Sequence, residues 1–165
     1  MNDHEMMQLS QQLGEALRQL GATVTTAESC TGGWLAKVIT DTAGSSAWFE
    51  RGFVTYSNEA KQQMTGVDGA TLEAYGAVSE PVVKQMAQGA LTAAAANWAV
   101  SVSGIAGPDG GSAEKPVGTV WFGFANDRGE VQAIRQNFMG DREAVRRQAT
   151  FFALQTLWQN IRQKA

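Results

Sequence analysis

Apolar side chains recur at every third or fourth position near both ends of the chain, a spacing that is typical of amphipathic helices. The first such segment covers residues 5–20, and Gly21 directly after it is expected to end the helix. The expected apolar face consists of Met6, Leu9, Leu13, Ala16, Leu17 and Leu20. A second long helix is predicted over residues 141–163, where Asp141 is a suitable N-cap. The apolar side of this second helix draws on Ala144, Ala149, Phe152, Leu157 and Ile161.

Runs of β-branched and apolar residues between these two helices predict strands. The expected strands are 22–28, 49–57, 98–107, 117–125 and 131–139, with the last two paired as a hairpin. The expected intervening helices are 31–40, a short one that Asn58 caps and Gly66 ends, another around 68–75, and one that Ser79 caps. Helices and strands alternate in the N-terminal part of the chain, and a β-hairpin follows near its C-terminal end. The pattern therefore predicts a three-layer α/β/α sandwich with a mixed sheet, as one domain over residues 1–165.

The composition argues against several classes of partner and site. The net charge is −3 and no block of lysine or arginine is present, so nucleic acid is not an expected partner. No apolar run is long enough to cross a bilayer or to form a signal peptide. The single cysteine, Cys30, cannot form an internal disulfide, which suits a cytoplasmic location. One histidine and one cysteine also make a structural zinc site unexpected.

The stretch AESCTGG, residues 27–33, holds two candidate nucleophiles where a predicted strand passes into a predicted helix. Free N–H groups at a helix start can hold a phosphate or the oxyanion of a tetrahedral intermediate, and glycines let a ligand approach the backbone. Ser29 is thus either a nucleophile or a helix cap, because serine is a preferred cap. Cys30 is the weaker candidate, because the single histidine, His4, lies near the N-terminus, away from this turn.

Lys61 is the candidate base. With Asn58 as the cap, Lys61 falls at the third helical position, where the positive end of the helix dipole disfavours a cation. Burial would lower its pKa further, and a neutral amine can then activate a serine. The alternative is a solvated surface lysine, which is the common case. Tyr56, at the end of a predicted strand, either relays a proton or is a half-buried strand aromatic.

A second glycine-rich turn, SGIAGPDGG at residues 103–111, also follows a predicted strand. Ligands of open α/β sheets collect at the carboxyl ends of strands, where Ser29, Tyr56 and Ser103 are all expected. Arginines at the start of the last helix are either phosphate ligands or ordinary surface charges. The absence of a well-placed histidine excludes the Ser-His-Asp and Cys-His arrangements, which leaves a serine with a lysine base among the few hydrolytic routes.

Three motifs at these positions, TTAESCTGGW, GFVTYSNEAK and SVSGIAGPDGGSAEKPVGTVWF, resemble the CinA C-terminal domain family. The resemblance extends from Leu9 to Leu157 and is closest to the stand-alone bacterial members of the family. It implies hydrolysis of the carboxamide of nicotinamide mononucleotide to nicotinate mononucleotide and ammonia, a step of pyridine nucleotide recycling that needs no cofactor. By similarity, Ser29 is the nucleophile, Lys61 its base, and Tyr56 an assisting hydroxyl.

The resemblance also implies a binding site for this small-molecule substrate and a homodimer or larger homo-oligomer. The residues expected to bind the substrate are Cys30, Thr31, Gly32, Gly33, Asn58, Ser103, Gly104, Gly107, Arg142 and Arg146. The backbone N–H groups from Cys30 to Gly33 are expected to hold the oxyanion, and the two arginines the phosphate. Two alternatives stay open on the residues alone: a nucleotide-binding sensor without catalysis, and an amidase for another small amide.

Overall fold

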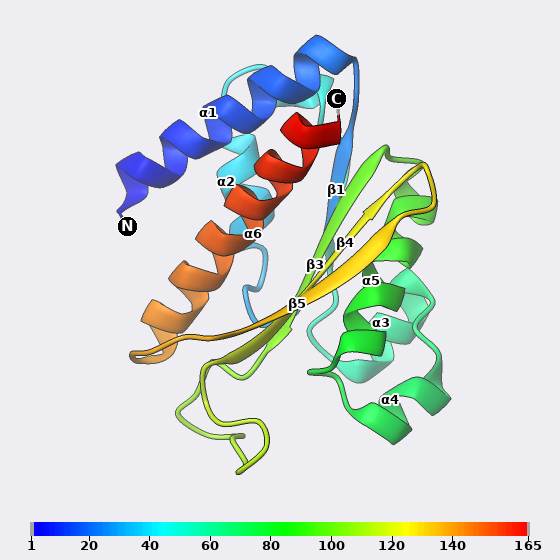
Figure 1. Cartoon of the computed structure of the whole chain (residues 1–165), viewed down its shortest axis with the longest axis vertical. Helices are drawn as coiled ribbons and strands as arrows, with labels where there is room; N and C mark the ends of the chain where they lie inside the picture. The colour runs from blue at the N-terminus through cyan, green and yellow to red at the C-terminus, as the bar shows by residue number, and fades with distance from the viewer. Residues whose placement is uncertain (1, 165) are drawn as a thin grey trace.

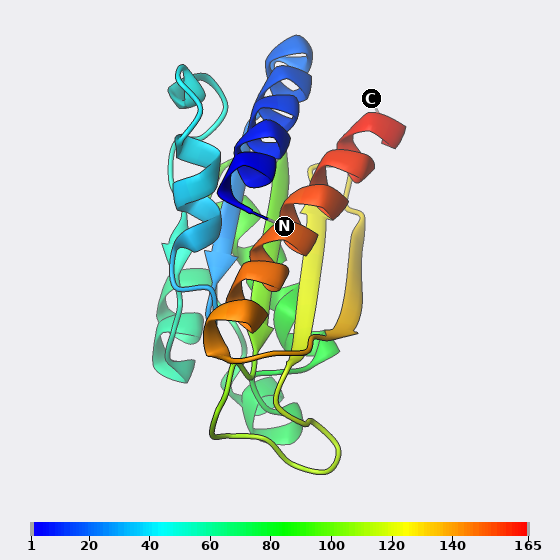
Figure 2. The ribbon, with the colours of Figure 1, turned by 90° about the vertical axis from the view of Figure 1, so that its left-hand side faces the viewer.

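A mixed five-stranded sheet between two layers of helices forms the computed structural model, which describes residues 2–164 (Figures 1 and 2). The strands, in the sheet order β2–β1–β3–β4–β5, are β1 (Val24–Glu28), β2 (Phe53–Val54), β3 (Trp98–Gly104), β4 (Thr119–Asn126) and β5 (Val131–Asn137). The helices are α1 (Asp3–Leu20), α2 (Trp34–Thr40), the 3-10 helix η1 (Ser45–Ala47), α3 (Asn58–Thr65), α4 (Gly69–Tyr75), α5 (Glu80–Ala94) and α6 (Arg142–Lys164). The predicted three-layer sandwich is confirmed.

Each face of the sheet has its own core. Helices α1, α2 and α6 cover one face, where Leu13, Leu17 and Leu154 are fully buried. Helices α3, α4 and α5 cover the other, where Val83 and Met86 are fully buried. Among residues 2–164, none of the helices is both long and apolar enough to span a lipid bilayer.

Strand β1 brings the candidate residues together because it pairs in parallel with both β2 and β3. The carboxyl ends of these parallel strands therefore lie at the same edge of the sheet, with Glu28 opposite Val102 in the register. Side chains alternate between the two faces along a strand. Ala27 packs in the α5 core, so Glu28 points to the α2 face and the residue after it returns to the face of α3 and α5.

The predicted strand over 49–57 is wrong for most of its length. Only β2 pairs with β1 as a ladder, and an isolated bridge joins Phe49 to Val24. From Val24 to Ala27 the chain advances three residues, whereas their partners Phe49 and Phe53 are four apart. One extra residue on the edge strand interrupts the ladder, as in a β-bulge.

Three predicted helix boundaries are confirmed and one is corrected. Gly21 ends α1 in the left-handed conformation with φ 61°, Gly66 ends α3, and Asp141 caps α6 by accepting from the N–H of Ala144 at 2.9 Å. The cap of α3 is Ser57 rather than Asn58, because the Ser57 hydroxyl accepts from the N–H of Ala60 at 3.0 Å. Lys61 is consequently the fourth helical residue and not the third.

The position of α3, which carries Lys61, depends on a close approach to α5 at Gly89. A Cβ atom at Gly89 would lie 1.6 Å from the Thr65 carbonyl oxygen, so the helices must separate to admit one. We expect Gly89→Ala to lower the free energy of unfolding by about 1–3 kcal/mol, despite the higher helix propensity of alanine. Urea denaturation measures this change, with Gln88→Ala at the exposed neighbouring position as the control. An unchanged midpoint for Gly89→Ala would contradict the close approach.

Candidate active site

Ser29 lies in the turn that follows β1, at the wall of a cavity of about 290 Å³. Its N–H donates to the Val102 carbonyl at 2.9 Å and so extends the β1–β3 ladder by one residue. Its hydroxyl lies 3.3 Å from the Tyr56 carbonyl oxygen. The hydrogen bonds of the Ser29 hydroxyl involve Tyr56 and Lys61 and no N–H group at a helix start. This disfavours the alternative that Ser29 is only a helix cap.

Lys61 is buried, with 1% of its surface exposed, and its Nζ lies 3.0 Å from Ser29 Oγ. The Nζ also donates to the carbonyl oxygens of Thr55 at 2.9 Å and Tyr56 at 3.2 Å. Within residues 2–164 no carboxylate forms an ion pair with it. Burial lowers the pKa of Lys61 from 10.5 to about 8, since the buried cation has lost much of its hydration. The alternative of a solvated surface lysine is thereby excluded.

The groups around Lys61 can satisfy the side chain in both of its protonation states. A charged ammonium has three N–H donors, which match the Ser29 hydroxyl and the carbonyls of Thr55 and Tyr56. A neutral amine has two, and when the carbonyls take both, its lone pair is left for the Ser29 O–H. Rotation of the Ser29 O–H from the Tyr56 carbonyl to the Lys61 nitrogen would then give the hydrogen bond that base catalysis requires.

Sequence reasoning missed Glu28, whose buried carboxylate occupies the start of α2. It accepts from the Thr31 hydroxyl at 2.6 Å and from the N–H groups of Leu35 at 2.9 Å and Ala36 at 3.0 Å. The amides of Leu35 and Ala36 are therefore not free for an oxyanion, whereas the donors expected from the sequence were the earlier N–H groups of Cys30 to Gly33. An acidic residue directly before a glycine-rich helix start is the signal that could have suggested this role.

The remaining candidate for the oxyanion is the N–H of Cys30. The Ser29 carbonyl accepts from Gly32 N–H at 3.1 Å, which fixes the peptide unit that carries the Cys30 amide. That amide donates to no backbone carbonyl among the described residues, and Cys30 lines the cavity. Burial raises the pKa of the Cys30 thiol to about 12, so the side chain is a thiol at neutral pH and a poor nucleophile.

Most of the residues expected from the sequence gather around this one cavity. Of the expected site residues, Ser29, Cys30, Tyr56, Asn58, Lys61, Ser103, Gly104, Gly107 and Arg142 line it. The lining also includes Ile105, Ala106, Asp109 and Gly110 of the predicted glycine-rich turn, together with Ala77 and Val78, which the sequence did not suggest. The loop between β3 and β4 that supplies several of them projects beyond the end of the sheet (Figure 1). Thr31, Gly32, Gly33 and Arg146 do not line the cavity, and their expected contact with a ligand is not supported.

Arg142 and Arg146 have different surroundings. Arg142 lines the cavity, where its guanidinium donates to the Gly107 carbonyl at 2.8 Å and to the Tyr56 hydroxyl at 3.2 Å. Arg146 instead donates to the carbonyl of Cys30 at 3.0 Å and to that of Thr31 at 3.4 Å. Arg146 thus holds the turn that carries Ser29. The Tyr56 side chain is 60% exposed, and its backbone carbonyl, rather than its hydroxyl, contacts Lys61.

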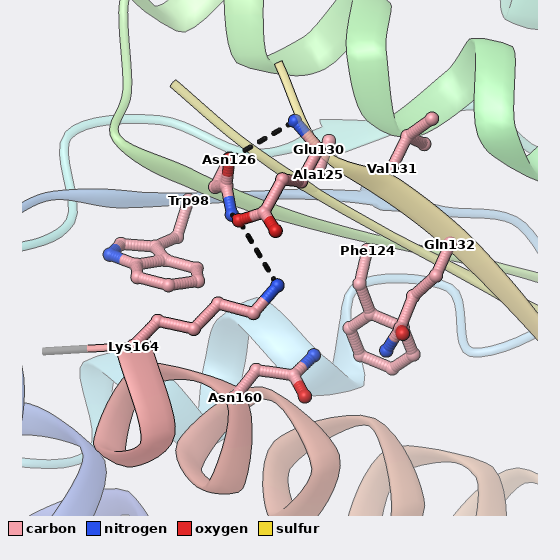
Figure 3. Close-up of a pocket in the computed structure, with 9 residues that line it drawn as sticks. All are labelled: Trp98, Phe124, Ala125, Asn126, Glu130, Val131, Gln132, Asn160 and Lys164. Carbon is pink, nitrogen blue, oxygen red and sulfur yellow. Dashed lines mark hydrogen bonds and ion pairs between the residues drawn. The ribbon is translucent and has the colours of Figure 1, made fainter. Parts of the chain in front are cut away.

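A second cavity, of about 140 Å³, lies at the opposite end of the sheet, between the β4–β5 hairpin and the end of α6 (Figure 3). Its charged side chains, Glu130 and Lys164, form an ion pair of 3.1 Å with each other. Its walls are otherwise aromatic, aliphatic and amide groups, such as Trp98, Phe124 and Asn160. Its lining, over the described part of the chain, contains no serine, threonine or cysteine, in contrast to the cavity at Ser29.

Comparison with known proteins finds relatives along nearly the whole chain. A model of the CinA C-terminal domain matches residues 6–161. The nicotinamide-nucleotide amidohydrolase PncC of Escherichia coli is 73% identical over 163 residues, which cover 99% of each chain. The protein of the same name from Pseudomonas putida is 55% identical, over 92% of this chain and 94% of its own.

Solved structures agree with the sequence relatives. A competence-damaged protein (CinA) superfamily protein from Klebsiella pneumoniae has a TM-score of 0.92 at 42% identity and covers 99% of both chains. The competence/damage inducible protein CihA from Agrobacterium tumefaciens has a TM-score of 0.91 at 45% identity, covering 95% of this chain and 94% of that one. With the fold, the family match and these identities in agreement, the chain belongs to the CinA C-terminal domain family.

Proposed function

We propose that this protein is a nicotinamide-nucleotide amidase that hydrolyses the carboxamide of nicotinamide mononucleotide to nicotinate mononucleotide and ammonia, and so recycles pyridine nucleotides. The observation that carries the proposal is the 3.0 Å contact between the buried amine of Lys61 and the hydroxyl of Ser29, at the wall of a cavity. The names of the relatives from Escherichia coli and Pseudomonas putida support the choice of substrate.

The reaction proceeds through an acyl-enzyme. Neutral Lys61 takes the proton of Ser29 while Ser29 Oγ attacks the carboxamide carbon, and the Cys30 N–H donates to the oxyanion that forms. The C–N bond then breaks, and protonated Lys61 gives its proton to the leaving nitrogen, which departs as ammonia. Water attacks the ester with Lys61 as base, which releases the carboxylate product and restores the Ser29 hydroxyl.

Arg142 is the proposed partner of the substrate phosphate, because it is the one arginine among the described residues that line the cavity. We expect Arg142→Ala to raise KM for nicotinamide mononucleotide by roughly 10- to 100-fold, the effect of losing a charge-assisted contact. Free nicotinamide lacks the phosphate, so any slow turnover of it should change little. Steady-state ammonia release on both compounds measures this.

Arg147→Ala is the matched control for Arg142→Ala. Arg147 lies on the same helix, but its guanidinium pairs with Asp3 and Glu143 at the surface rather than lining the cavity. An equal rise of KM in both variants, or no rise in Arg142→Ala, would show that Arg142 does not bind the substrate phosphate.

Ammonia release from nicotinamide mononucleotide by the purified protein tests the proposed function directly. Release with formation of nicotinate mononucleotide is the expected result. Binding of the nucleotide without ammonia would indicate a sensor in its place. Turnover of free nicotinamide as efficient as that of the nucleotide would indicate an amidase for another small amide.

A further inference from the structure

Ser103, at the end of β3, has a hydroxyl at the wall of the cavity that contains Ser29, and this hydroxyl forms no hydrogen bond within the described residues. The side chain is 1% exposed and lines the cavity that contains Ser29. Hydroxyl groups that leave bulk water usually keep a hydrogen-bond partner, from the protein, from water or from a ligand. A hydroxyl without a protein partner at the wall of a binding cavity is explained when a ligand supplies the partner.

Ser101 shows how a serine of the same strand is satisfied where no ligand is involved. It lies two residues before Ser103, so both side chains point to the α5 face of the sheet. The Ser101 hydroxyl donates to the Val83 carbonyl of α5 at 2.6 Å. At Ser103 the strand has passed beyond that contact, and the cavity takes the place of the helix backbone.

The register places Ser103 beside the reacting serine. Glu28 is opposite Val102, and the N–H of Ser29 donates to the Val102 carbonyl at 2.9 Å, so Ser29 and Ser103 are neighbours on adjacent strands. Adjacent strands lie about 4.8 Å apart, and both residues face the side of the sheet from which Lys61 approaches. A carboxamide attacked by Ser29 is therefore within reach of the Ser103 hydroxyl.

A primary carboxamide brings one acceptor oxygen and two N–H donors into the cavity, and all of them must be satisfied on burial. The oxygen has the Cys30 N–H. Neutral Lys61 gives both of its hydrogens to the Thr55 and Tyr56 carbonyls and its lone pair to Ser29, so it accepts nothing from the substrate. The cavity also contains possible acceptors in Asn58 and Asp109, but the Ser103 hydroxyl is the one that the register places beside Ser29.

We propose that the Ser103 hydroxyl accepts a hydrogen bond from the NH₂ group of the substrate carboxamide and makes the site selective for an amide. This inference rests on the proposed amidase function. Ser103 acts in the acylation step, where the N–H bond is present, and has no corresponding contact with an ester, whose alkoxy oxygen carries no hydrogen.

The test compares two substrates of the full chain, nicotinamide mononucleotide and the methyl ester of nicotinate mononucleotide, through kcat/KM, which reports acylation. In Ser103→Ala we expect kcat/KM for the amide to fall roughly 10- to 100-fold, as for other lost hydrogen bonds to a substrate, with that for the ester nearly unchanged. An equal fall on both substrates, or no fall on the amide, overturns the proposal.

Ser101→Ala is the control for the loss of a strand hydroxyl. It removes a satisfied hydrogen bond, so we expect a lower urea midpoint and an unchanged amide-to-ester ratio. The same change of that ratio in Ser101→Ala would also count against a specific role for Ser103. Wild-type protein that releases no ammonia would overturn the proposed function itself, whereas an active wild type with an unaffected Ser103→Ala overturns only the inference about Ser103.

Discussion

Replacing Ser29 by alanine is expected to abolish ammonia release from nicotinamide mononucleotide while the fold survives. The variant removes the atom that is proposed to attack the carboxamide, and loss of a serine nucleophile lowers kcat by about 10,000-fold or more in serine hydrolases. The fold should be retained because the Ser29 hydroxyl makes only a 3.3 Å contact with a carbonyl and the contact with Lys61. Ammonia release and urea denaturation measure the two effects.

Two further measurements separate a lost nucleophile from a damaged turn. Cys30→Ala retains the backbone N–H that is proposed to hold the oxyanion, so we expect this variant to keep most of its activity. Wild-type protein quenched during turnover should carry an acyl group on the peptide that contains Ser29, as seen by mass spectrometry. Substantial turnover by Ser29→Ala would show that Ser29 is not the nucleophile.

The sequence was sufficient for those parts of the fold that depend on local pattern. The spacing of Leu9, Leu13 and Leu17 along one face predicts α1, and the glycine after it supplies the left-handed residue that ends the helix. The hairpin of β4 and β5 follows from two apolar runs around a short turn. Such features need only neighbouring residues, so a single chain shows them.

The sequence was insufficient where a partner comes from a distant segment. Arg146 reads as a surface cation or phosphate ligand, yet it donates to two carbonyls of the turn at Ser29, more than a hundred residues earlier in the chain. The carboxylate of Glu28 accepts from two amide groups at the start of α2, a role that was not predicted. The edge strand β2 is short because of one extra residue, which only the pairing with β1 reveals.

The role of Lys61 could be predicted from the sequence only in part. Its residue type and its place near a helix start suggest a base, but only the structure shows that the amine is buried against Ser29. We expect Lys61→Ala to reduce kcat nearly as far as Ser29→Ala does, because the serine then has no proton acceptor. Lys61→Arg should not restore activity, since arginine stays protonated and cannot take the serine proton. Activity of Lys61→Arg near that of the wild type would exclude Lys61 as the base.

The pH dependence of activity and stability identifies the protonation state that Lys61 needs. Its pKa is lowered to about 8, so the neutral amine, and with it kcat/KM, should increase with pH and level off above about 8. The unfolded chain, with a lysine pKa of 10.5, binds more protons than the folded one between these values, so the free energy of unfolding should increase over that range as well. That gain is complete above 10.5 and is lost as the pH falls to about 8.

Lys61→Met keeps a side chain of similar length but has no proton to lose, so its unfolding free energy should lack this increase with pH. Urea denaturation of the wild type and of Lys61→Met between pH 8 and 10 measures the change in stability. The pH dependence of activity is measured as kcat/KM of the wild type over a wider pH range. If kcat/KM stays flat down to pH 5, the amine is not the titrating base. If the increase in stability persists in Lys61→Met, another group titrates over this range. Loss of the increase in stability in Lys61→Met, together with a wild-type kcat/KM that levels off near pH 8, would assign both effects to the buried amine of Lys61.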